Sequence, residues 1–232
     1  MAVEERAFAS ASDATQALAD AVAADLATAL AERPRASLVV SGGRSPIAFF
    51  ERLREAALDW SRVVVTLADE RWVPPEHPDS NARLVAEHLL QGKAAAALFV
   101  PLWNGAEKPT EAIAERTAAL AALPRPIDAL VLGMGEDGHT ASLFPGAAGL
   151  AEALDPRGTA LLAAIDPPTA PHPRLSLTLT ALLDSRRIHL PLGGAAKHAV
   201  YRRALASGDS TQWPIAAALC QPRVPVSVYL AP

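Results

Sequence analysis

The residues of this chain that are best suited to catalysis lie in one stretch, 128–146, with the sequence DALVLGMGEDGHTASLFPG. Its opening apolar run is typical of a buried strand, and the glycines that follow indicate a tight loop. His139 ends this loop, two residues after Asp137. An imidazole can take up a proton near neutral pH, so His139 is a candidate general base and Asp137 a candidate to orient its ring. The alternative is a histidine that only stabilises the loop.

Gly133, Gly135 and Gly138 have the G-x-G-x-x-G spacing of a dinucleotide-binding loop. Such a loop joins the first strand of a domain to a sustained helix. Here Pro145 and Gly146 interrupt the chain soon after the third glycine, and a long stretch of sequence precedes the loop. A nicotinamide-dependent dehydrogenase is therefore only a distant alternative.

A second candidate site is the turn 41–46, SGGRSP, which follows an expected strand at 37–40. Ser45 is placed to cap a helix and Pro46 to occupy its first position. A strand that passes through glycines into a helix N-terminus directs backbone N–H groups at one point, and this arrangement favours an anion. The alternative is an ordinary turn that needs glycine for its dihedral angles.

Two further polar segments also follow expected strands. Residues 69–72, DERW, come after the strand 63–67, and residues 193–197, GGAAK, come after the strand 188–192. The carboxyl ends of parallel strands share one edge of a sheet, where open α/β folds bind ligands. We therefore expect one site to be formed by the segments 41–46, 69–72, 133–139 and 193–197.

The elements that must position these residues indicate an α/β fold. Strands and helices alternate over about the first 145 residues, which predicts a mostly parallel, Rossmann-like sheet with helices on both faces. The first helix is expected over 13–32, capped by Ser12 or Asp13. Residues 174–179, RLSLTL, alternate strictly, which predicts a strand with one polar face. We expect a single domain over residues 1–232.

The composition excludes several classes of protein. With 232 residues, 50% of them apolar, and a net charge of −4, the chain is expected to be soluble and globular. It has no Lys/Arg run and no long apolar stretch, so neither a nucleic acid nor a membrane is expected as a partner. Cys220 is the one cysteine and no secretory signal pattern is present, so we expect a reducing, cytoplasmic location.

With these segments in place, the chain resembles the 6-phosphogluconolactonases. The resemblance rests on SGGRSP (41–46), DERWVPPEHPDSNARL (69–84) and LGMGEDGHTASLFPG (132–146), with weaker support from RLSLT (174–178) and GGAAK (193–197). It implies a hydrolase of the oxidative pentose phosphate pathway that acts on a phosphorylated sugar lactone. It also implies a fold shared with glucosamine-6-phosphate deaminases and ribose-5-phosphate isomerases. Such a reaction requires no metal or organic cofactor, and we expect a monomer.

A hydrolase of this kind must first hold the phosphate. The expected ligands are the backbone N–H groups of Gly42, Gly43 and Arg44, with charge from Arg71 and Lys197. Arg44 departs from the Ser-Thr-Pro that usually continues this turn in the family, so it could either contact the phosphate or point outward. Arg71 is in addition a candidate to stabilise the oxyanion.

The enzyme must also activate water and stabilise the oxyanion. His139 would be the base, with either Asp137 or Asp69 to orient it or to stabilise the imidazolium. Loop N–H groups from Gly133 to Gly135 would face the developing negative charge. A metal bound at His139 is disfavoured because the tight loop offers few well-spaced ligands.

Two alternative functions are less consistent with the sequence. A glucosamine-6-phosphate deaminase or isomerase is the nearest one, but those enzymes typically follow Asp-Gly-His with Asn-Glu-Pro, whereas Leu143-Phe144-Pro145 stands here. A non-catalytic sugar-phosphate sensor would not need His139 with its adjacent acids.

The end VYLAP lacks the acidic residue common in the family, so it is assigned no function. The remaining histidines have no matched acid in the sequence and are expected in packing or at the surface: His77, His88, His172, His189 and His198.

Overall fold

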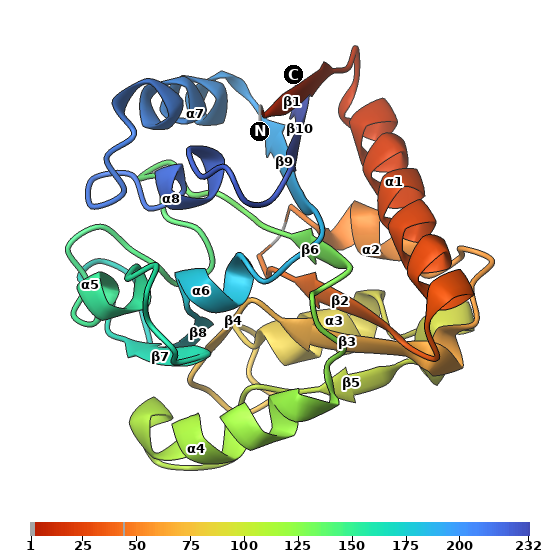
Figure 1. Cartoon of the computed structure of the whole chain (residues 1–232), viewed down its shortest axis with the longest axis horizontal. Coiled ribbons are helices and arrows are strands. Elements are labelled where there is room, and N and C mark those ends of the chain that lie inside the picture. Colours follow the sequence, from red (N-terminus) through yellow and green to blue (C-terminus); the bar gives the residue numbers. More distant parts are fainter. Residues whose placement is uncertain (1–2, 44) are drawn as a thin grey trace.

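Within the described residues, 3–43 and 45–232, the computed structural model has a seven-stranded parallel sheet at its centre (Figure 1). The strands lie in the order β1 (Glu4–Ala7), β10 (Val226–Ala231), β9 (Ile188–Gly193), β6 (Ala129–Val131), β2 (Ala36–Val40), β3 (Val63–Leu67) and β5 (Leu98–Val100). Every neighbouring pair is parallel. This confirms the predicted α/β fold with a mostly parallel sheet.

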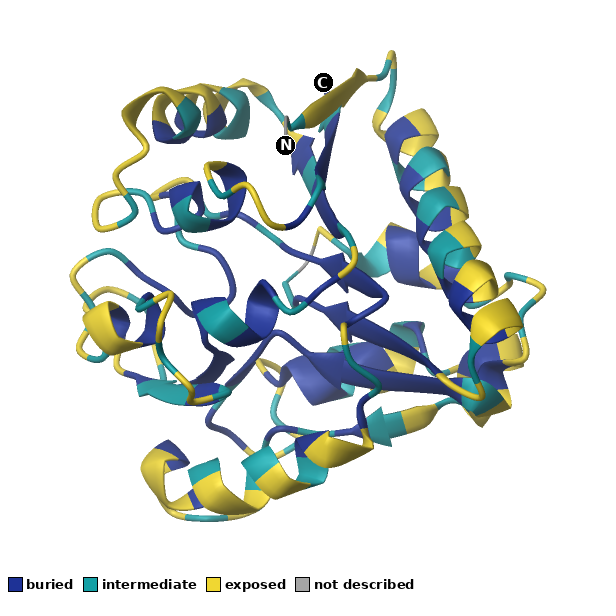
Figure 2. Ribbon diagram, viewed as in Figure 1, coloured by how far each residue is buried: buried dark blue, intermediate teal, exposed yellow. Residues whose placement is uncertain are grey.

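Helices cover both faces of this sheet. Figure 1 shows α1 (Ala11–Glu32) and α2 (Ile47–Leu53) on one side and α7 (Ala195–Ser207) and α8 (Ala216–Leu219) on the other. The other helices are α3 (Asn81–His88), α4 (Pro109–Ala119), α5 (Leu150–Ala153) and α6 (Leu179–Leu182), with 3-10 turns η1 (Trp60–Arg62), η2 (Gly92–Ala96) and η3 (Leu120–Ala122). β2 and β3 are wholly buried, as expected for strands covered on both faces. The buried stripe of α1 is visible in Figure 2.

A second, antiparallel sheet lies beside the first. Its strands are, in spatial order, β4 (Asp69–Arg71), β8 (Arg174–Leu177) and β7 (Leu162–Ile165). The alternating sequence of β8 correctly predicts a strand, and the polar residues Arg174 and Ser176 are buried in the structure. Ser176 accepts a hydrogen bond at 3.3 Å from the backbone N–H of Ser142, in the loop that follows β6. The polar face of β8 therefore supports that loop.

Two helix starts and one strand differ from the sequence prediction. Ser10, not Ser12 or Asp13, caps α1, and its hydroxyl accepts a hydrogen bond from the Asp13 backbone N–H at 3.1 Å. α2 begins without the expected Ser45 cap because Pro46 already has helical dihedrals (φ −81°, ψ −5°) and its carbonyl closes the first turn. The sequence did not predict β1, since all four of its residues are exposed and it lacks an apolar alternation.

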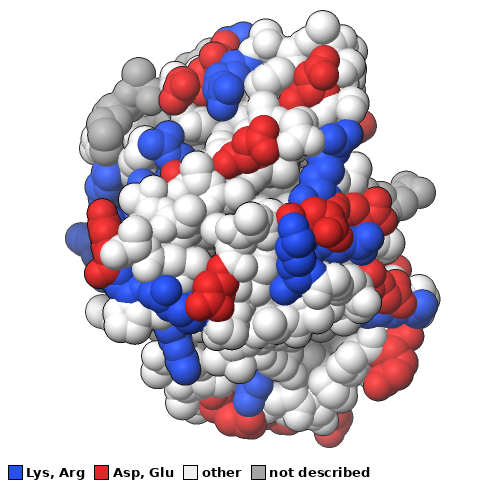
Figure 3. Space-filling view, turned by 90° about the vertical axis from the view of Figure 1, so that its right-hand side faces the viewer, with Lys and Arg blue, Asp and Glu red and all other residues white. Residues whose placement is uncertain are grey.

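The surface agrees with the weak net charge of the chain. On the face shown in Figure 3, basic and acidic side chains are interspersed, without a broad area of one sign. Among the described residues, no helix is both long and apolar enough to span a membrane.

Candidate functional site

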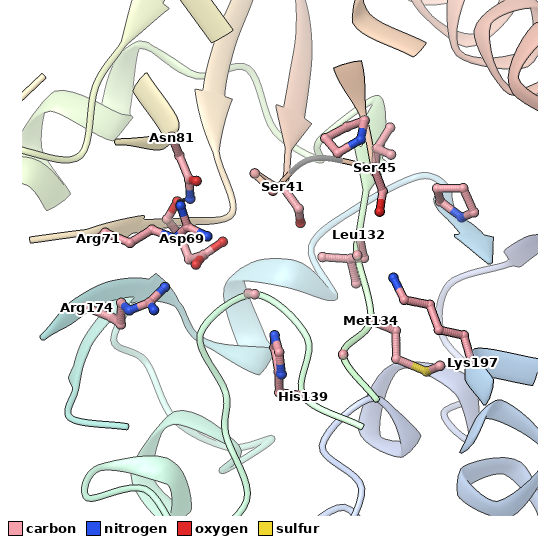
Figure 4. Close-up of a pocket in the computed structure, with 18 residues that line it drawn as sticks. Ser41, Ser45, Asp69, Arg71, Asn81, Leu132, Met134, His139, Arg174 and Lys197 are labelled. Carbon is pink, nitrogen blue, oxygen red and sulfur yellow. Dashed lines mark hydrogen bonds between the residues drawn. The ribbon is translucent and has the colours of Figure 1, made fainter. Parts of the chain in front are cut away.

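A pocket of about 250 Å³ lies at the carboxyl ends of the central strands (Figure 4). Most of its lining comes from four segments: the turn after β2, the β4 segment after β3, the loop after β6 and the first turn of α7 after β9. Asn81 of α3 and Arg174 of β8 complete the walls. The pocket is lined by the expected residues Gly42, Gly43, Asp69, Arg71, Gly133, Gly135, His139 and Lys197. Asp137 stands next to His139, and Arg44 lies outside the described residues. The four polar segments thus meet at one place, as expected for segments that follow the carboxyl ends of parallel strands.

The His139 ring is held on two sides and open on a third. Its Nδ1 lies 2.6 Å from a carboxylate oxygen of Asp137, and its ring stacks on Phe144 with centroids 4.1 Å apart. The side chain keeps 30% of its surface exposed, at the pocket. Burial raises the pKa of Asp137, but the hydrogen bonds from the ring and backbone N–H of His139 outweigh it, and the net pKa is lowered from 3.8. Asp137 is therefore a carboxylate placed to fix the ring and stabilise its protonated form.

Asp69, the other candidate partner of His139, is bonded elsewhere. One of its carboxylate oxygens accepts a hydrogen bond from the Ser142 hydroxyl at 2.6 Å, and the residue is 5% exposed. Figure 4 places Asp69 on the pocket wall beside Arg71. The geometry therefore pairs Asp137, rather than Asp69, with His139.

The loop after β6 requires glycine at position 135. A Cβ atom there would lie 2.2 Å from His139 Nδ1 and 2.5 Å from the Asp137 carboxylate. The Gly135 N–H donates to the His139 carbonyl at 2.9 Å, so it is not available to a ligand. Among residues 3–43 and 45–232, the N–H groups of Gly133 and Met134 have no acceptor, and both residues line the pocket. These two N–H groups, rather than that of Gly135, are free to stabilise an oxyanion.

Two guanidinium groups share one wall of the pocket. Arg71 on β4 and Arg174 on β8 are cross-strand partners, and Figure 4 shows both on the same side. Arg71 Nη1 donates to the Asp79 carbonyl at 2.6 Å, and Arg174 Nε donates to the His172 carbonyl at 3.2 Å. Arg174 was not among the expected site residues, although the alternation of its strand had already placed it on a polar face.

Asn81 also lines the pocket and was missed by the sequence analysis. Its amide Nδ2 donates to the Asp69 carbonyl at 2.8 Å, while its buried Oδ1 has no partner among the described residues. A Cβ atom on Gly42 would lie 1.8 Å from that oxygen. The backbone N–H groups of Asn81 and Ala82, at the start of α3, donate to the Glu70 carboxylate. Asn81 is thus packed tightly between the turn after β2 and the β4 segment.

The opposite wall carries a cation without a carboxylate. Figure 4 shows Lys197 and Ser45 across the pocket from Arg71, with His139 between the two walls. Within the part of the chain that the structure describes, the N–H groups of Gly42 and Gly43 have no acceptor. Among the described lining residues, the only carboxylate belongs to Asp69, on the arginine wall. The lysine wall is therefore suited to an anion.

Comparison with known proteins identifies the family of this chain. Residues 9–226 match the family model of glucosamine-6-phosphate isomerases/6-phosphogluconolactonase. A 6-phosphogluconolactonase from Pseudomonas aeruginosa is 48% identical over 223 residues, which cover 96% of this chain and 92% of the relative. One from Rhizobium meliloti is 48% identical over 217 residues, 94% of each chain.

Solved structures place the fold in the same group. The crystal structure of a 6-phosphogluconolactonase from Shewanella baltica superimposes with a TM-score of 0.97 at 44% identity, and covers 99% of this chain and 98% of that one. A monomeric glucosamine-6-phosphate deaminase has a TM-score of 0.79 at 17% identity, which shows a shared fold alone. The chain belongs to the glucosamine-6-phosphate isomerase/6-phosphogluconolactonase family.

Proposed function

We propose that the protein hydrolyses 6-phospho-D-glucono-1,5-lactone to 6-phosphogluconate, a reaction of the oxidative pentose phosphate pathway. The main structural support for this activity is the His139–Asp137 pair, which opens onto a pocket with unpartnered N–H groups and a cation on each of two walls. Relatives at 44–48% identity over nearly the whole chain bear the name of this activity.

The proposed mechanism is direct attack by water on the lactone carbonyl. With its Nδ1 bonded to Asp137, His139 accepts a proton from water at Nε2 as the hydroxide oxygen bonds to the carbonyl carbon. The N–H groups of Gly133 and Met134 stabilise the oxyanion of the tetrahedral intermediate. When that intermediate collapses, the bond from the carbonyl carbon to the ring oxygen breaks, and the imidazolium returns its proton to the ring oxygen. No cofactor enters this balance.

The phosphate is assigned to the lysine wall. The ammonium group of Lys197 and the N–H groups of Gly42 and Gly43 can all donate to phosphate oxygens, without a competing carboxylate. Arg71 and Arg174 share the other wall with Asp69, whose charge offsets one of theirs. These arginines would then contact the lactone ring and its oxyanion rather than the phosphate.

A deaminase is disfavoured by the residues that follow His139. Phe144 is 5% exposed and stacks on the His139 ring, and Leu143 is 1% exposed. An additional carboxylate for proton transfer is not supplied by Leu143-Phe144-Pro145, so ring opening and isomerisation of an amino sugar would lack that acid.

Hydrolysis of 6-phosphogluconolactone, corrected for spontaneous ring opening, tests the proposal. Wild type should accelerate the reaction, and His139→Ala should lower kcat by about 10²–10⁴-fold, the usual contribution of a general base. His88→Ala is the matched control, because His88 pairs with Glu51 outside the pocket. Binding of a phosphorylated sugar without any rate above background would indicate a sensor, and ammonia release from glucosamine 6-phosphate would indicate a deaminase.

A further inference from the structure

Two histidines and an aspartate meet between two loops outside the lactone site. His77 and Asp79 lie between β4 and α3, and His172 lies between β7 and β8. One ring nitrogen of each histidine and a carboxylate oxygen of Asp79 lie within 4.8 Å of one another. The three side chains retain 26–51% of their surface, so an ion can reach them from solvent. No acidic partner was expected for these histidines from the sequence, whereas the fold brings His172 to an acid 93 residues away.

The separations are close to those of a coordination sphere. His172 Nε2 lies 3.0 Å from Asp79 Oδ2, and His77 Nδ1 lies 3.9 Å from the same oxygen. Ligands about 2.0–2.1 Å from a tetrahedral ion are about 3.3 Å from each other, so small side-chain rotations would suffice. His172 has a left-handed backbone (φ 68°), which is uncommon for a residue with a Cβ atom and is held here by the surrounding loop.

We propose that His77, Asp79 and His172 bind a divalent transition-metal ion such as Zn²⁺, with water completing the coordination. Two imidazole nitrogens and one carboxylate oxygen suit Zn²⁺, Co²⁺ or Ni²⁺, whereas Mg²⁺ and Ca²⁺ prefer oxygen ligands alone. The ion replaces the proton that joins His172 to Asp79. It also takes the His77 lone pair that now accepts a hydrogen bond from the Asp79 backbone N–H at 3.1 Å.

The site is joined to the pocket by two carbonyl groups. Arg71 donates to the Asp79 carbonyl and Arg174 to the His172 carbonyl, so the ion ties together the two loops that hold both guanidiniums. The charge of Arg71 opposes a bound cation, and the carboxylate of Asp79 offsets it. The ion itself lies outside the lining of the lactone pocket, so its binding does not depend on the proposed function.

Titration of the untagged, chelator-treated protein with Co²⁺, followed by visible absorption near neutral pH, tests the site. All proteins carry Cys220→Ser, which removes the exposed thiol. We expect about one Co²⁺ per chain, displaced by Zn²⁺ but not by Mg²⁺. His172→Asn, which tolerates the left-handed backbone, and Asp79→Asn should each weaken Co²⁺ affinity at least about tenfold. His88→Asn and His139→Asn should bind as the parent does.

A second measurement separates loss of the site from loss of the fold. Zn²⁺ should raise the Tm of the parent protein and leave that of His172→Asn unchanged, while the two proteins without Zn²⁺ melt at similar temperatures. Absence of Co²⁺ binding by the parent would overturn the proposal. So would equal affinity in His172→Asn, or loss of binding in His139→Asn alone, which would place the ion at the lactone site instead.

Discussion

Gly135→Ala should remove catalysis while leaving the fold nearly intact. The added Cβ would lie 2.2 Å from His139 Nδ1 and 2.5 Å from the Asp137 carboxylate, well inside van der Waals contact. Both clashing groups are ends of half-exposed side chains, with 30% and 43% of their surface open, so they can rotate away at little cost in stability. The rotation breaks the His139–Asp137 hydrogen bond and moves the base from its position.

The expected magnitude follows from the role proposed for His139. Misplacement of a general base costs about 10²–10⁴-fold in kcat, so Gly135→Ala should approach the rate of His139→Ala. Acid release from 6-phosphogluconolactone, followed in a pH-stat, gives kcat and KM, and thermal unfolding gives Tm. Gly193→Ala is the matched control, because its Cβ would meet no atom closer than 3.9 Å and the residue does not line the pocket.

A double-mutant cycle tests whether Gly135 acts through His139. If the glycine acts only through the histidine, Gly135→Ala combined with His139→Ala should be no slower than His139→Ala alone. A Gly135→Ala enzyme with kcat within about twofold of wild type would refute the account. Additive losses in the double mutant would equally show that the glycine acts by another route.

Four further outcomes are expected. Lys197→Ala should raise KM for 6-phosphogluconolactone about tenfold or more and leave KM for the unphosphorylated lactone unchanged, since only the phosphate loses a charged donor; equal effects on both lactones would contradict the lysine wall as phosphate site. Arg71→Ala should instead lower kcat/KM for both lactones alike. A loss confined to the phosphorylated lactone would place the phosphate at Arg71 rather than on the lysine wall. Burial raises the pKa of Glu70 from 4.5 to about 7 despite its backbone donors, so the folded state binds a proton that the unfolded state releases. The free energy of unfolding, from urea titrations, should therefore decrease as pH rises from about 5 to 7, and a slope that persists in Glu70→Gln would disprove this cause. Leu38→Ala, at a fully buried position of β2, should lower the free energy of unfolding by about 2–5 kcal/mol.

The position of the site could be predicted because it depends on a general property of parallel sheets. Apolar runs mark the strands, and the residues after each run must meet at the carboxyl edge. This places His139, Arg71 and Lys197 around one pocket without any knowledge of their side-chain contacts. The family resemblance is confirmed by the family model and the relatives, although it did not decide which acid accompanies the histidine.

The contacts within the site could not be predicted because they join residues far apart in the sequence. Asp69 is bonded to Ser142, 73 residues away, whereas the carboxylate that contacts His139 belongs to Asp137. Arg174 enters the pocket because β8 pairs with β4 in a second sheet, and strand patterns do not specify their partners. The bond between Gly135 and the His139 carbonyl depends on a loop conformation that residue types alone leave open.

The contact between Gly42 and Asn81 limits how this pocket could be redesigned. Any side chain at position 42 would occupy the volume of the Asn81 amide, yet that amide also supplies the donor for the Asp69 carbonyl. Neither position can be altered alone without a void, an overlap or an orphaned carbonyl elsewhere. Redesign of the pocket for a bulkier substrate must therefore change Gly42 and Asn81 together. The same design must supply a new hydrogen-bond donor for the backbone carbonyl of Asp69.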